Sequence, residues 1–297
     1  MEGRPIFLSW ERGPDVKVLV TGATGFIGSH VVEALLRRDV EVIATSRERY
    51  KAEILGWYKK VRYIPYDMNV AHEQIFDELG RPDILIHLAW EGLPNYQAVF
   101  HKEKNYPAHC SFLENMVRSG LKKLVVTGTC LEYGMKTGCL SEAMKPEPVV
   151  PYAQAKDELR RYLEKLRDKM HFDLIWVRFF YMFGPGQSER SLLPQLQKAI
   201  DRGEASFNMS QGEQLRDYLP VEKVAENIVR ISLQNKVSGV INCCSGNPVS
   251  VRDFVQGYLK EMGKKINLNW GFYPYLDYEP MAFWGDTRKL KEALNGQ

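Results

Sequence analysis

The sequence is poor in cysteine and lacks any long apolar run. Its five cysteines are an odd number without CxxC spacing, which argues against a disulfide framework and against a metal site. We therefore expect no bound metal and a reducing compartment, the cytoplasm. No apolar stretch approaches the roughly 18 residues that a membrane-spanning helix requires, so we expect no membrane partner.

Like charges do not form blocks either. The 40 Lys and Arg residues are interspersed with 37 Asp and Glu residues, and the formal net charge is +3. This balance offers no basic surface to a nucleic acid, so we expect no such partner. Residues 1–15 contain no signal-peptide cleavage pattern, and we interpret them as a loose leader.

Short β-branched segments alternate with amphipathic helical patterns along the first 180 residues. This alternation predicts an α/β fold with a doubly wound parallel sheet, covered by helices on both faces, over residues 16–183. Later elements are shorter, with helices expected near 220–234 and 250–262, and predict a smaller α/β substrate-binding lobe over residues 184–297. We expect strands at VKVLV (16–20), EVIATS (41–46), VRYIP (61–65), DILIHLA (83–89), KKLVVTG (122–128) and FDLIWVRFF (172–180).

A glycine-rich loop follows the first of these segments. VLVTGATGFIGSH (18–30) carries Gly22, Gly25 and Gly28 in GxxGxxG spacing and continues into a helical pattern. Such glycines let the backbone turn tightly and approach a pyrophosphate, whose charge a helix N-terminus favours. The segment predicts a dinucleotide site on a Rossmann-type sheet. A glycine-rich turn without a ligand is the alternative.

The end of the second predicted strand bears on the choice of dinucleotide. It reads Thr45-Ser46-Arg47, where NAD enzymes usually place an acidic residue for the ribose 2′-hydroxyl. A hydroxyl and a guanidinium can bind a 2′-phosphate that a carboxylate would repel. We therefore favour NADP(H), with NAD(H) as an alternative. Arg47 could equally be a solvated charge in a generally basic loop.

The segment PYAQAK (151–156) places Tyr152 and Lys156 four residues apart at the start of a predicted helix. Side chains at this spacing share one helix face. An ammonium at about 4 Å, in an effective dielectric of about 20, stabilises a phenolate by ~4 kcal/mol. We therefore expect Lys156 to lower the pKa of Tyr152 by roughly three units and make it a usable acid or base. A chance YxxxK spacing is the alternative.

A third segment argues against the alternative that the YxxxK spacing arose by chance. KKLVVTGTCLEYG (122–134) resembles the S/T-x-x-x-Y-G segment of the extended short-chain dehydrogenases/reductases, and the chain resembles that family from residue 16 to about 295. In the family, the hydroxyl four residues before the tyrosine binds the substrate oxygen, which implies this role for Thr129. The resemblance implies Thr129, Tyr152 and Lys156 as catalytic residues.

The resemblance also implies a set of cofactor contacts. Asp67 and Met68 match the pair that cradles the adenine, and Asn105 matches an asparagine that supports the active site. In HLAW (87–90), Trp90 replaces a small residue, which should narrow the cleft near the nicotinamide or the substrate. The implied cofactor-binding residues are Gly22, Thr24, Gly25, Phe26, Ile27, Gly28, Ser46, Arg47, Asp67, Met68, Leu88, Ala89, Trp90, Asn105, Thr127, Tyr152, Lys156 and Phe179.

Departures from related patterns narrow the reaction. Dehydratases of the family follow their threonine with Asp-Glu, whereas this chain has Cys130-Leu131 and so lacks the proton shuttle for elimination. Reductases that also epimerise have a cysteine and a histidine where this chain has Leu131 and Gly186. We interpret Cys130, one position out of register, as a packed small hydrophobe. A 4-epimerase and a simple ketoreductase remain.

The second lobe resembles that of nucleotide-sugar enzymes. GEQLRDYLPVEKVAE (212–226) is similar to a family segment in which an arginine holds the diphosphate, which implies this role for Arg216; an ion pair with a carboxylate is the alternative. Tyr181 stands where such enzymes usually have asparagine. The implied substrate-binding residues are Trp90, Glu91, Thr129, Tyr181, Leu192, Leu193, Phe207 and Arg216.

The HLAW and GTCLEYG variants are most similar to bacterial dTDP-6-deoxysugar 4-dehydrogenases. We predict NADPH-dependent reduction of the C4 ketone of a nucleotide-linked, dTDP-type 4-keto-6-deoxyhexose. One alternative is an NAD-dependent nucleotide-sugar 4-epimerase, and another is a non-catalytic NADP(H)-binding protein on the same fold. A homodimer through helices around 96–119 and 152–170 is implied by the resemblance alone.

Overall fold

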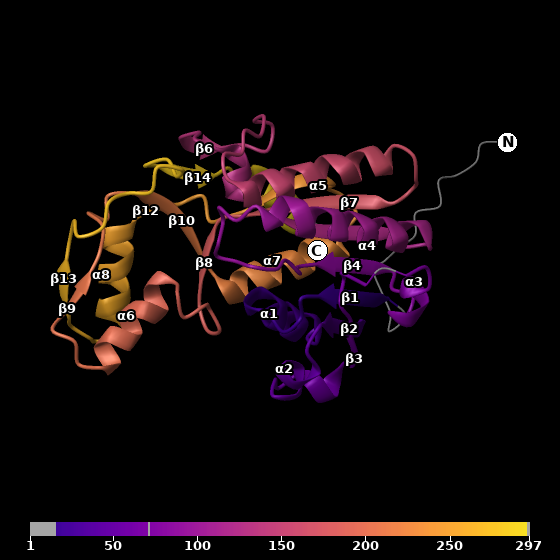
Figure 1. Cartoon of the computed structure of the whole chain (residues 1–297), viewed down its shortest axis with the longest axis horizontal. Coiled ribbons are helices and arrows are strands. Elements are labelled where there is room, and N and C mark those ends of the chain that lie inside the picture. The colour runs from indigo at the N-terminus through magenta and orange to yellow at the C-terminus, as the bar shows by residue number, and fades with distance from the viewer. Residues whose placement is uncertain (1–15, 71, 296–297) are drawn as a thin grey trace.

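A seven-stranded sheet organises the larger part of the molecule (Figure 1). The computed structural model describes residues 16–70 and 72–295, so the predicted leader lies outside the described residues. The strand order is β11-β7-β5-β4-β1-β2-β3, with every neighbouring pair parallel. Order reverses between β1 and β4, where doubly wound sheets bind ligands. The strands are β1 Lys17–Thr21, β2 Glu41–Ser46, β3 Arg62–Pro65, β4 Ile84–His87, β5 Lys123–Thr129, β7 Asp173–Phe179 and β11 Gly239–Cys243.

Both faces of this sheet are buried. On β1, Val18 and Val20 enter one apolar cluster, and Leu19 enters the other. Burial on both sides explains why the strands read as nearly continuous apolar runs. Helices α1 Phe26–Leu35, α7 Val221–Leu233 and α9 Arg288–Leu294 cover the first face, and α4 Tyr106–Arg118 and α5 Pro151–Arg167 cover the second. The predicted α/β fold with a doubly wound parallel sheet is confirmed.

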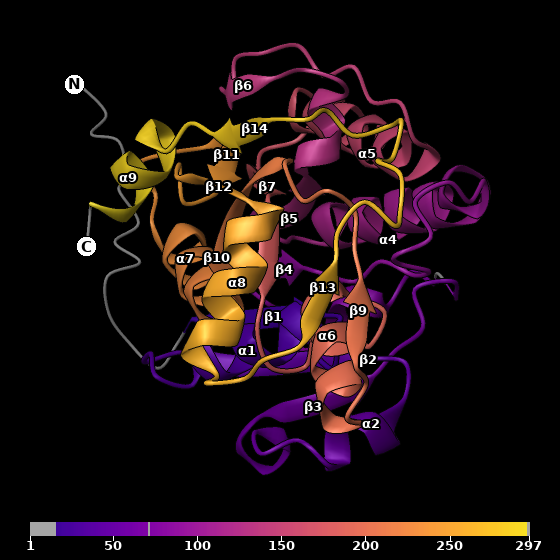
Figure 2. The same ribbon diagram turned by 90° about the vertical axis from the view of Figure 1, so that its left-hand side faces the viewer.

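The smaller lobe has its own apolar core, made of side chains such as Leu196, Met209 and Val255. Its helices stand beside short strands at one end of the molecule, as Figures 1 and 2 show. Its elements are β8 Tyr181–Phe183, α6 Leu192–Asp201, β9 Ser206–Asn208, β10 Leu215–Pro220, β12 Pro248–Ser250, α8 Val251–Glu261 and β13 Asn267–Asn269. The short strands β6 Gly138–Leu140 and β14 Phe283–Gly285 pair with each other.

The chain returns to the large sheet after entering the smaller lobe. β11 pairs with β7, and α7 packs in the same apolar cluster as α1. The boundary predicted after residue 183 therefore does not separate the two parts in space. After β7, the last strand predicted for the large sheet, the alternation of strand and helix continues with α7 and β11.

Within residues 16–70 and 72–295, no helix has both the length and the apolar character to span a bilayer. The same residues contain no group of three or more metal-ligating acidic, histidine or cysteine side chains.

Candidate active site

The glycine-rich loop joins β1 to α1 in a conformation that side chains would prevent. Gly22 has a φ of +68°, and a Cβ there would lie 2.8 Å from the backbone nitrogen of Ala89. A Cβ on Gly28 would lie 2.1 Å from the Gly22 carbonyl oxygen. The first turn of α1 contains no acidic residue. The helix N-terminus is thus open to a pyrophosphate, which fits the predicted dinucleotide.

A cleft of about 240 Å³ adjoins this loop at the carboxyl ends of β1, β2, β3 and β4. Doubly wound sheets bind nucleotides in this position. Many of the predicted cofactor residues meet there, whereas Phe26, Ile27, Gly28, Thr127, Tyr152, Lys156 and Phe179 do not line it. Those that line it are Gly22, Thr24, Gly25, Ser46, Arg47, Asp67, Met68, Leu88, Ala89, Trp90 and Asn105.

Charges of both signs line the rim of the cleft. The Arg47 guanidinium lies 3.2 Å from the Glu91 carboxylate, and Lys104 lies 3.4 Å from the same carboxylate. Lys51 pairs with Glu48, which also lines the cleft. Glu91, predicted to contact the substrate, therefore lies at the cofactor side. The basic character predicted for this loop is largely neutralised.

The three predicted catalytic residues come from two adjoining elements. Thr129 ends β5, and Tyr152 and Lys156 lie in the first turns of α5. The Lys156 ammonium donates to the Thr127 carbonyl oxygen at 2.9 Å, which fixes it to the end of β5. Tyr152 and Lys156 are 7% and 2% exposed. The Thr129 hydroxyl accepts from the backbone N–H of Leu131, and a hydroxyl can also donate its own proton.

Burial dominates the titration of this pair. Withdrawal from water raises the pKa of Tyr152 well above its usual value, and neighbouring Tyr96, Glu132 and Cys130 add to the rise. Burial also lowers the pKa of Lys156 to about 7. The expectation that Lys156 brings the pKa of Tyr152 down is wrong, because burial outweighs any effect of the ammonium. A high pKa keeps the phenol protonated, which suits a proton donor.

Aromatic rings surround Tyr152, and of these the sequence pattern indicated only Trp90. The centroids of Trp90, Tyr96 and His101 lie 6.0, 5.5 and 5.3 Å from that of Tyr152. The backbone N–H of Tyr152 donates to the Tyr96 carbonyl at 3.1 Å. The loop after β4 thus closes over the start of α5. No sequence pattern predicts that Tyr96 and His101 contact Tyr152, because both lie about 50 positions from it in the chain.

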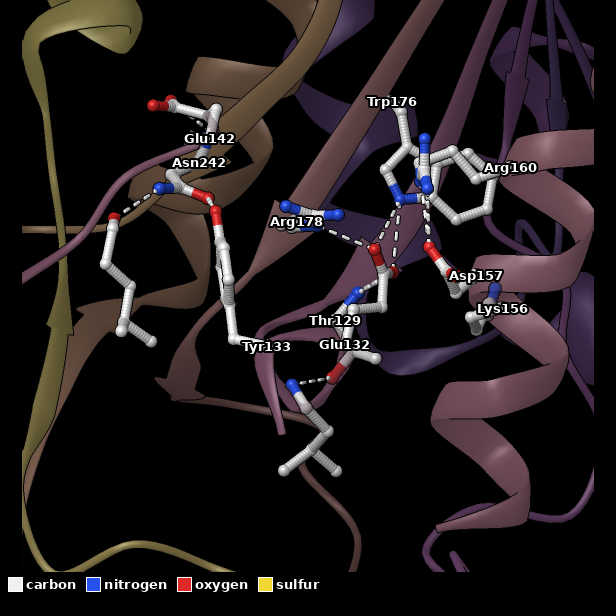
Figure 3. A network of polar contacts seen from close by, with 12 residues as sticks. Thr129, Glu132, Tyr133, Glu142, Lys156, Asp157, Arg160, Trp176, Arg178 and Asn242 are labelled. Atoms are coloured by element: carbon white, nitrogen blue, oxygen red, sulfur yellow. Dashed lines mark hydrogen bonds and ion pairs between the residues drawn. The ribbon is translucent and has the colours of Figure 1, made fainter. Parts of the chain in front are cut away.

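A buried ion pair supports Thr129 from behind (Figure 3). Glu132 is fully buried and accepts from Arg178 Nε at 2.6 Å, from the Trp176 indole at 3.1 Å and from the Thr129 backbone N–H at 2.8 Å. Tyr133 packs its ring 4.4 Å from the Arg178 guanidinium carbon. These contacts connect the end of β5 to β7. They fix the backbone that carries Thr129.

Cys130, in the same segment, is buried in an apolar cluster, as predicted. Burial raises the pKa of its thiol above the usual value, so the sulfur stays neutral.

The second lobe brings Arg216 and Tyr181 together. The Arg216 guanidinium donates to Glu279 at 2.9 Å, and the Tyr181 hydroxyl donates to the same carboxylate oxygen at 2.9 Å. Arg216 is only 2% exposed. Its ion pair is thus with Glu279, whereas the neighbouring Asp217 accepts from backbone N–H groups of the loop after β11, at Ser245 and Gly246.

The remaining substrate-binding residues predicted in this lobe lie on its apolar core. Leu193 is buried in that core, and Leu192 and Phe207 pack against it. They come from the start of α6 and from β9.

A comparison with protein families matches residues 18–244, more than half of the chain, to the NAD dependent epimerase/dehydratase family. The chain belongs to this family. The predicted resemblance and the prediction of an oxidoreductase-type enzyme are thereby confirmed. The roles of individual site residues remain predictions.

Similar proteins span nearly the whole chain. A dTDP-6-deoxy-L-talose 4-dehydrogenase (NAD(+)) from Aggregatibacter actinomycetemcomitans is 29% identical over 276 residues, which cover 91% of this chain and 99% of that protein. A GDP-6-deoxy-D-talose 4-dehydrogenase from the same organism is 27% identical, covering 94% and 91%. The solved structure of MoeE5 with UDP-glucuronic acid and NAD is 28% identical, with a TM-score of 0.79 and coverage of 94% and 92%.

Replacing Glu132 by Gln should lower the free energy of unfolding by about 3 kcal/mol or more, because removal of one partner leaves the buried Arg178 uncompensated. Chemical unfolding followed by circular dichroism measures this change. The exposed pair of Asp77 and Arg81 provides a matched control, and Asp77→Asn should have little effect. Equal stability of the two variants would show that the buried pair does not hold the end of β5.

Proposed function

We propose that this protein uses NAD(P)H to reduce the C4 ketone of a nucleotide-linked 4-keto-6-deoxyhexose. One observation carries the proposal: the buried phenol of Tyr152, whose pKa burial raises, adjoins the cleft through Trp90 and shares a helix face with Lys156. The names of two similar proteins, both 6-deoxytalose 4-dehydrogenases, support this substrate class.

The residues of the chain divide the proposed chemistry among them. NAD(P)H held at the glycine loop and the cleft supplies the hydride. Tyr152 donates its phenolic proton to the alkoxide oxygen that develops at C4. The Thr129 hydroxyl donates a hydrogen bond to the same oxygen, since its lone pair already accepts from Leu131. The Lys156 ammonium favours the transfer by stabilising the resulting phenolate.

Tyrosine protonation supports reduction over epimerisation. A 4-epimerase first uses its tyrosine as a base, which requires the phenolate. Burial raises the pKa of Tyr152, which favours the acid form that reduction needs. The epimerase remains the alternative because a UDP-glucose 4-epimerase from Neisseria meningitidis serogroup C is 26% identical over 95% of this chain.

In the second lobe we propose that Arg216 binds the substrate diphosphate, with Tyr181 beside the sugar and with Leu192, Leu193 and Phe207 around the base. A diphosphate that binds Arg216 has to displace Glu279, because this carboxylate pairs with the guanidinium. We propose dTDP as the nucleotide from the name of the dTDP-linked relative. A homodimer through α4 and α5 remains a prediction from the family resemblance, and a cytoplasmic location remains a prediction from the cysteine content.

Incubation with NADPH or NADH and a panel of dTDP-, GDP-, CDP- and UDP-linked 4-keto-6-deoxyhexoses tests the activity. We expect stoichiometric loss of nicotinamide absorbance with at least one of these sugars, together with a 6-deoxysugar product. An epimerase would instead interconvert sugars without net cofactor consumption. Stoichiometric binding without turnover across the panel would favour the non-catalytic alternative.

For the cofactor, we propose that Arg47 gives NADPH an advantage over NADH and that Glu91 limits this advantage. Arg47→Ala should raise the KM for NADPH about tenfold or more, corresponding to a charge-assisted hydrogen bond of about 1.5 kcal/mol, and should leave that for NADH nearly unchanged. Glu91→Gln should move the kcat/KM ratio a few-fold toward NADPH, because it removes a carboxylate 3.2 Å from Arg47.

Glu103→Gln is the control, since Glu103 is exposed and lies outside the cleft lining. Equal effects of the Glu91 and Glu103 substitutions, or an unchanged NADPH KM in Arg47→Ala, would contradict this assignment of cofactor preference.

A further inference from the structure

The Lys156 ammonium is buried against an aromatic face. Its Nζ atom lies 4.0 Å from the centroid of the Trp90 ring, and its hydrogen bond goes to the Thr127 carbonyl oxygen. We propose that Trp90, held in orientation by His101, positions the Lys156 ammonium for catalysis. The catalytic consequence rests on the proposed reductase function, whereas the positioning itself does not.

Hydrogen bonds determine the tautomer of His101. Its Nδ1 atom faces two donors, the Trp90 indole N–H at 3.1 Å and the Asn105 side-chain amide at 3.3 Å. Nδ1 therefore accepts, and the ring proton lies on Nε2, which donates to the Asn95 carbonyl at 2.8 Å. His101 is fully buried and neutral in this arrangement.

A local irregularity of the helix makes these contacts possible. Residues His101–Asn105 form a π-helical turn immediately before α4. Such turns often occur at functional sites. From this turn, His101 holds the Trp90 side chain and Asn105 donates to the Glu91 carbonyl at 3.0 Å. The two residues that follow Ala89 are thus fixed by one turn of a neighbouring element.

The histidines around Trp90 do not add a second positive charge beside the Lys156 ammonium. His109 stacks on the indole with ring centroids 4.6 Å apart, and its Nδ1 lies 2.7 Å from His87 Nε2. Burial and the nearby Lys156 lower the pKa of His109 to about 3 and hold that of His87 well below its usual value. Burial first, and Lys156 second, also lower the pKa of His101, against the opposing effect of the Asn95 carbonyl. The lysine is therefore the charged group among three neutral imidazoles.

This arrangement gives Trp90 a physical role. A buried ammonium is costly unless groups with negative potential face it. Here the Thr127 carbonyl and the indole face provide that potential, and a cation over a desolvated indole is favoured by cation–π attraction. The Glu132 carboxylate also favours the charged form of Lys156. A small residue at position 90 would remove the aromatic contribution and leave only the Thr127 carbonyl and Glu132. A tryptophan at this position therefore favours the charged form of the lysine.

The position of the lysine can be measured directly by NMR on protein labelled at the lysine ε carbons, with Lys156→Met to assign the signal. We expect an upfield ring-current shift of the Lys156 ε protons in the parent protein. Trp90→Leu should abolish this shift and move the Lys156 titration to lower pH. Trp90→Phe, which keeps a ring but loses the N–H donor, should give an intermediate shift, and so should His101→Gln.

Trp57→Phe is the matched control. It loses one indole N–H bond, to Ser29 at 2.9 Å, and lies outside the cleft lining. This variant should leave the Lys156 signal and the turnover unchanged. Trp90→Leu should lower kcat about 30-fold, and Trp90→Phe about fivefold, as expected for loss of a desolvated cation–π contact and of one neutral hydrogen bond.

An unshifted Lys156 signal in the parent, or a shift that persists in Trp90→Leu, would overturn the positioning role. If Trp90→Leu fails to fold, the comparison of Trp90→Phe and His101→Gln with the parent decides the question. Absence of turnover on the sugar panel together with a shifted Lys156 signal would refute the proposed function and leave the positioning intact.

Discussion

The buried ammonium of Lys156 is the constraint on which the site depends. A charge withdrawn from water is tolerated only where fixed dipoles or opposite charges face it. The Thr127 carbonyl and the Trp90 ring face it here, and burial still lowers its pKa to about 7. The groups that face the lysine therefore control its charge. The same burial keeps the adjacent Tyr152 protonated. One region of low polarity thus sets the protonation state of both residues.

The end of a single strand, β5, carries both the carbonyl group that binds Lys156 and the Thr129 hydroxyl. The position of that strand end depends on Glu132, whose carboxylate binds the Thr129 backbone and the Arg178 guanidinium together (Figure 3). A buried ion pair is weak evidence for stability by itself, yet removal of either partner is costly. The pair therefore acts as a geometric constraint behind the Thr129 hydroxyl.

Features that depend on neighbouring residues could be predicted from the sequence, whereas contacts between residues far apart in the chain could not. Alternating apolar segments predicted six strands of the large sheet, and i, i+4 spacing placed Tyr152 and Lys156 on one helix face. The ion pair of Arg216 with Glu279 joins positions 63 residues apart, so no local pattern reveals it. The direction of the Tyr152 pKa shift was mispredicted for a related reason: the Coulomb attraction of Lys156 can be read from spacing, but burial requires the packed structure. The position of Glu91 beside Arg47 in the cleft likewise could not be predicted, because it depends on how the two loops pack in the fold.

Transfer of deuterium from C4-deuterated NAD(P)H to a sugar 4-ketone, measured in a single turnover, tests the central role of the Tyr152 phenol most directly. We expect deuterium at C4 of the sugar with the parent protein and with Tyr162→Phe, which removes a hydroxyl from the same helix. For Tyr152→Phe we expect retained NAD(P)H binding and a transfer rate lower by about 10²–10⁴-fold, the usual contribution of a positioned acid. Transfer by Tyr152→Phe at the parental rate would show that the Tyr152 phenol is not the proton donor.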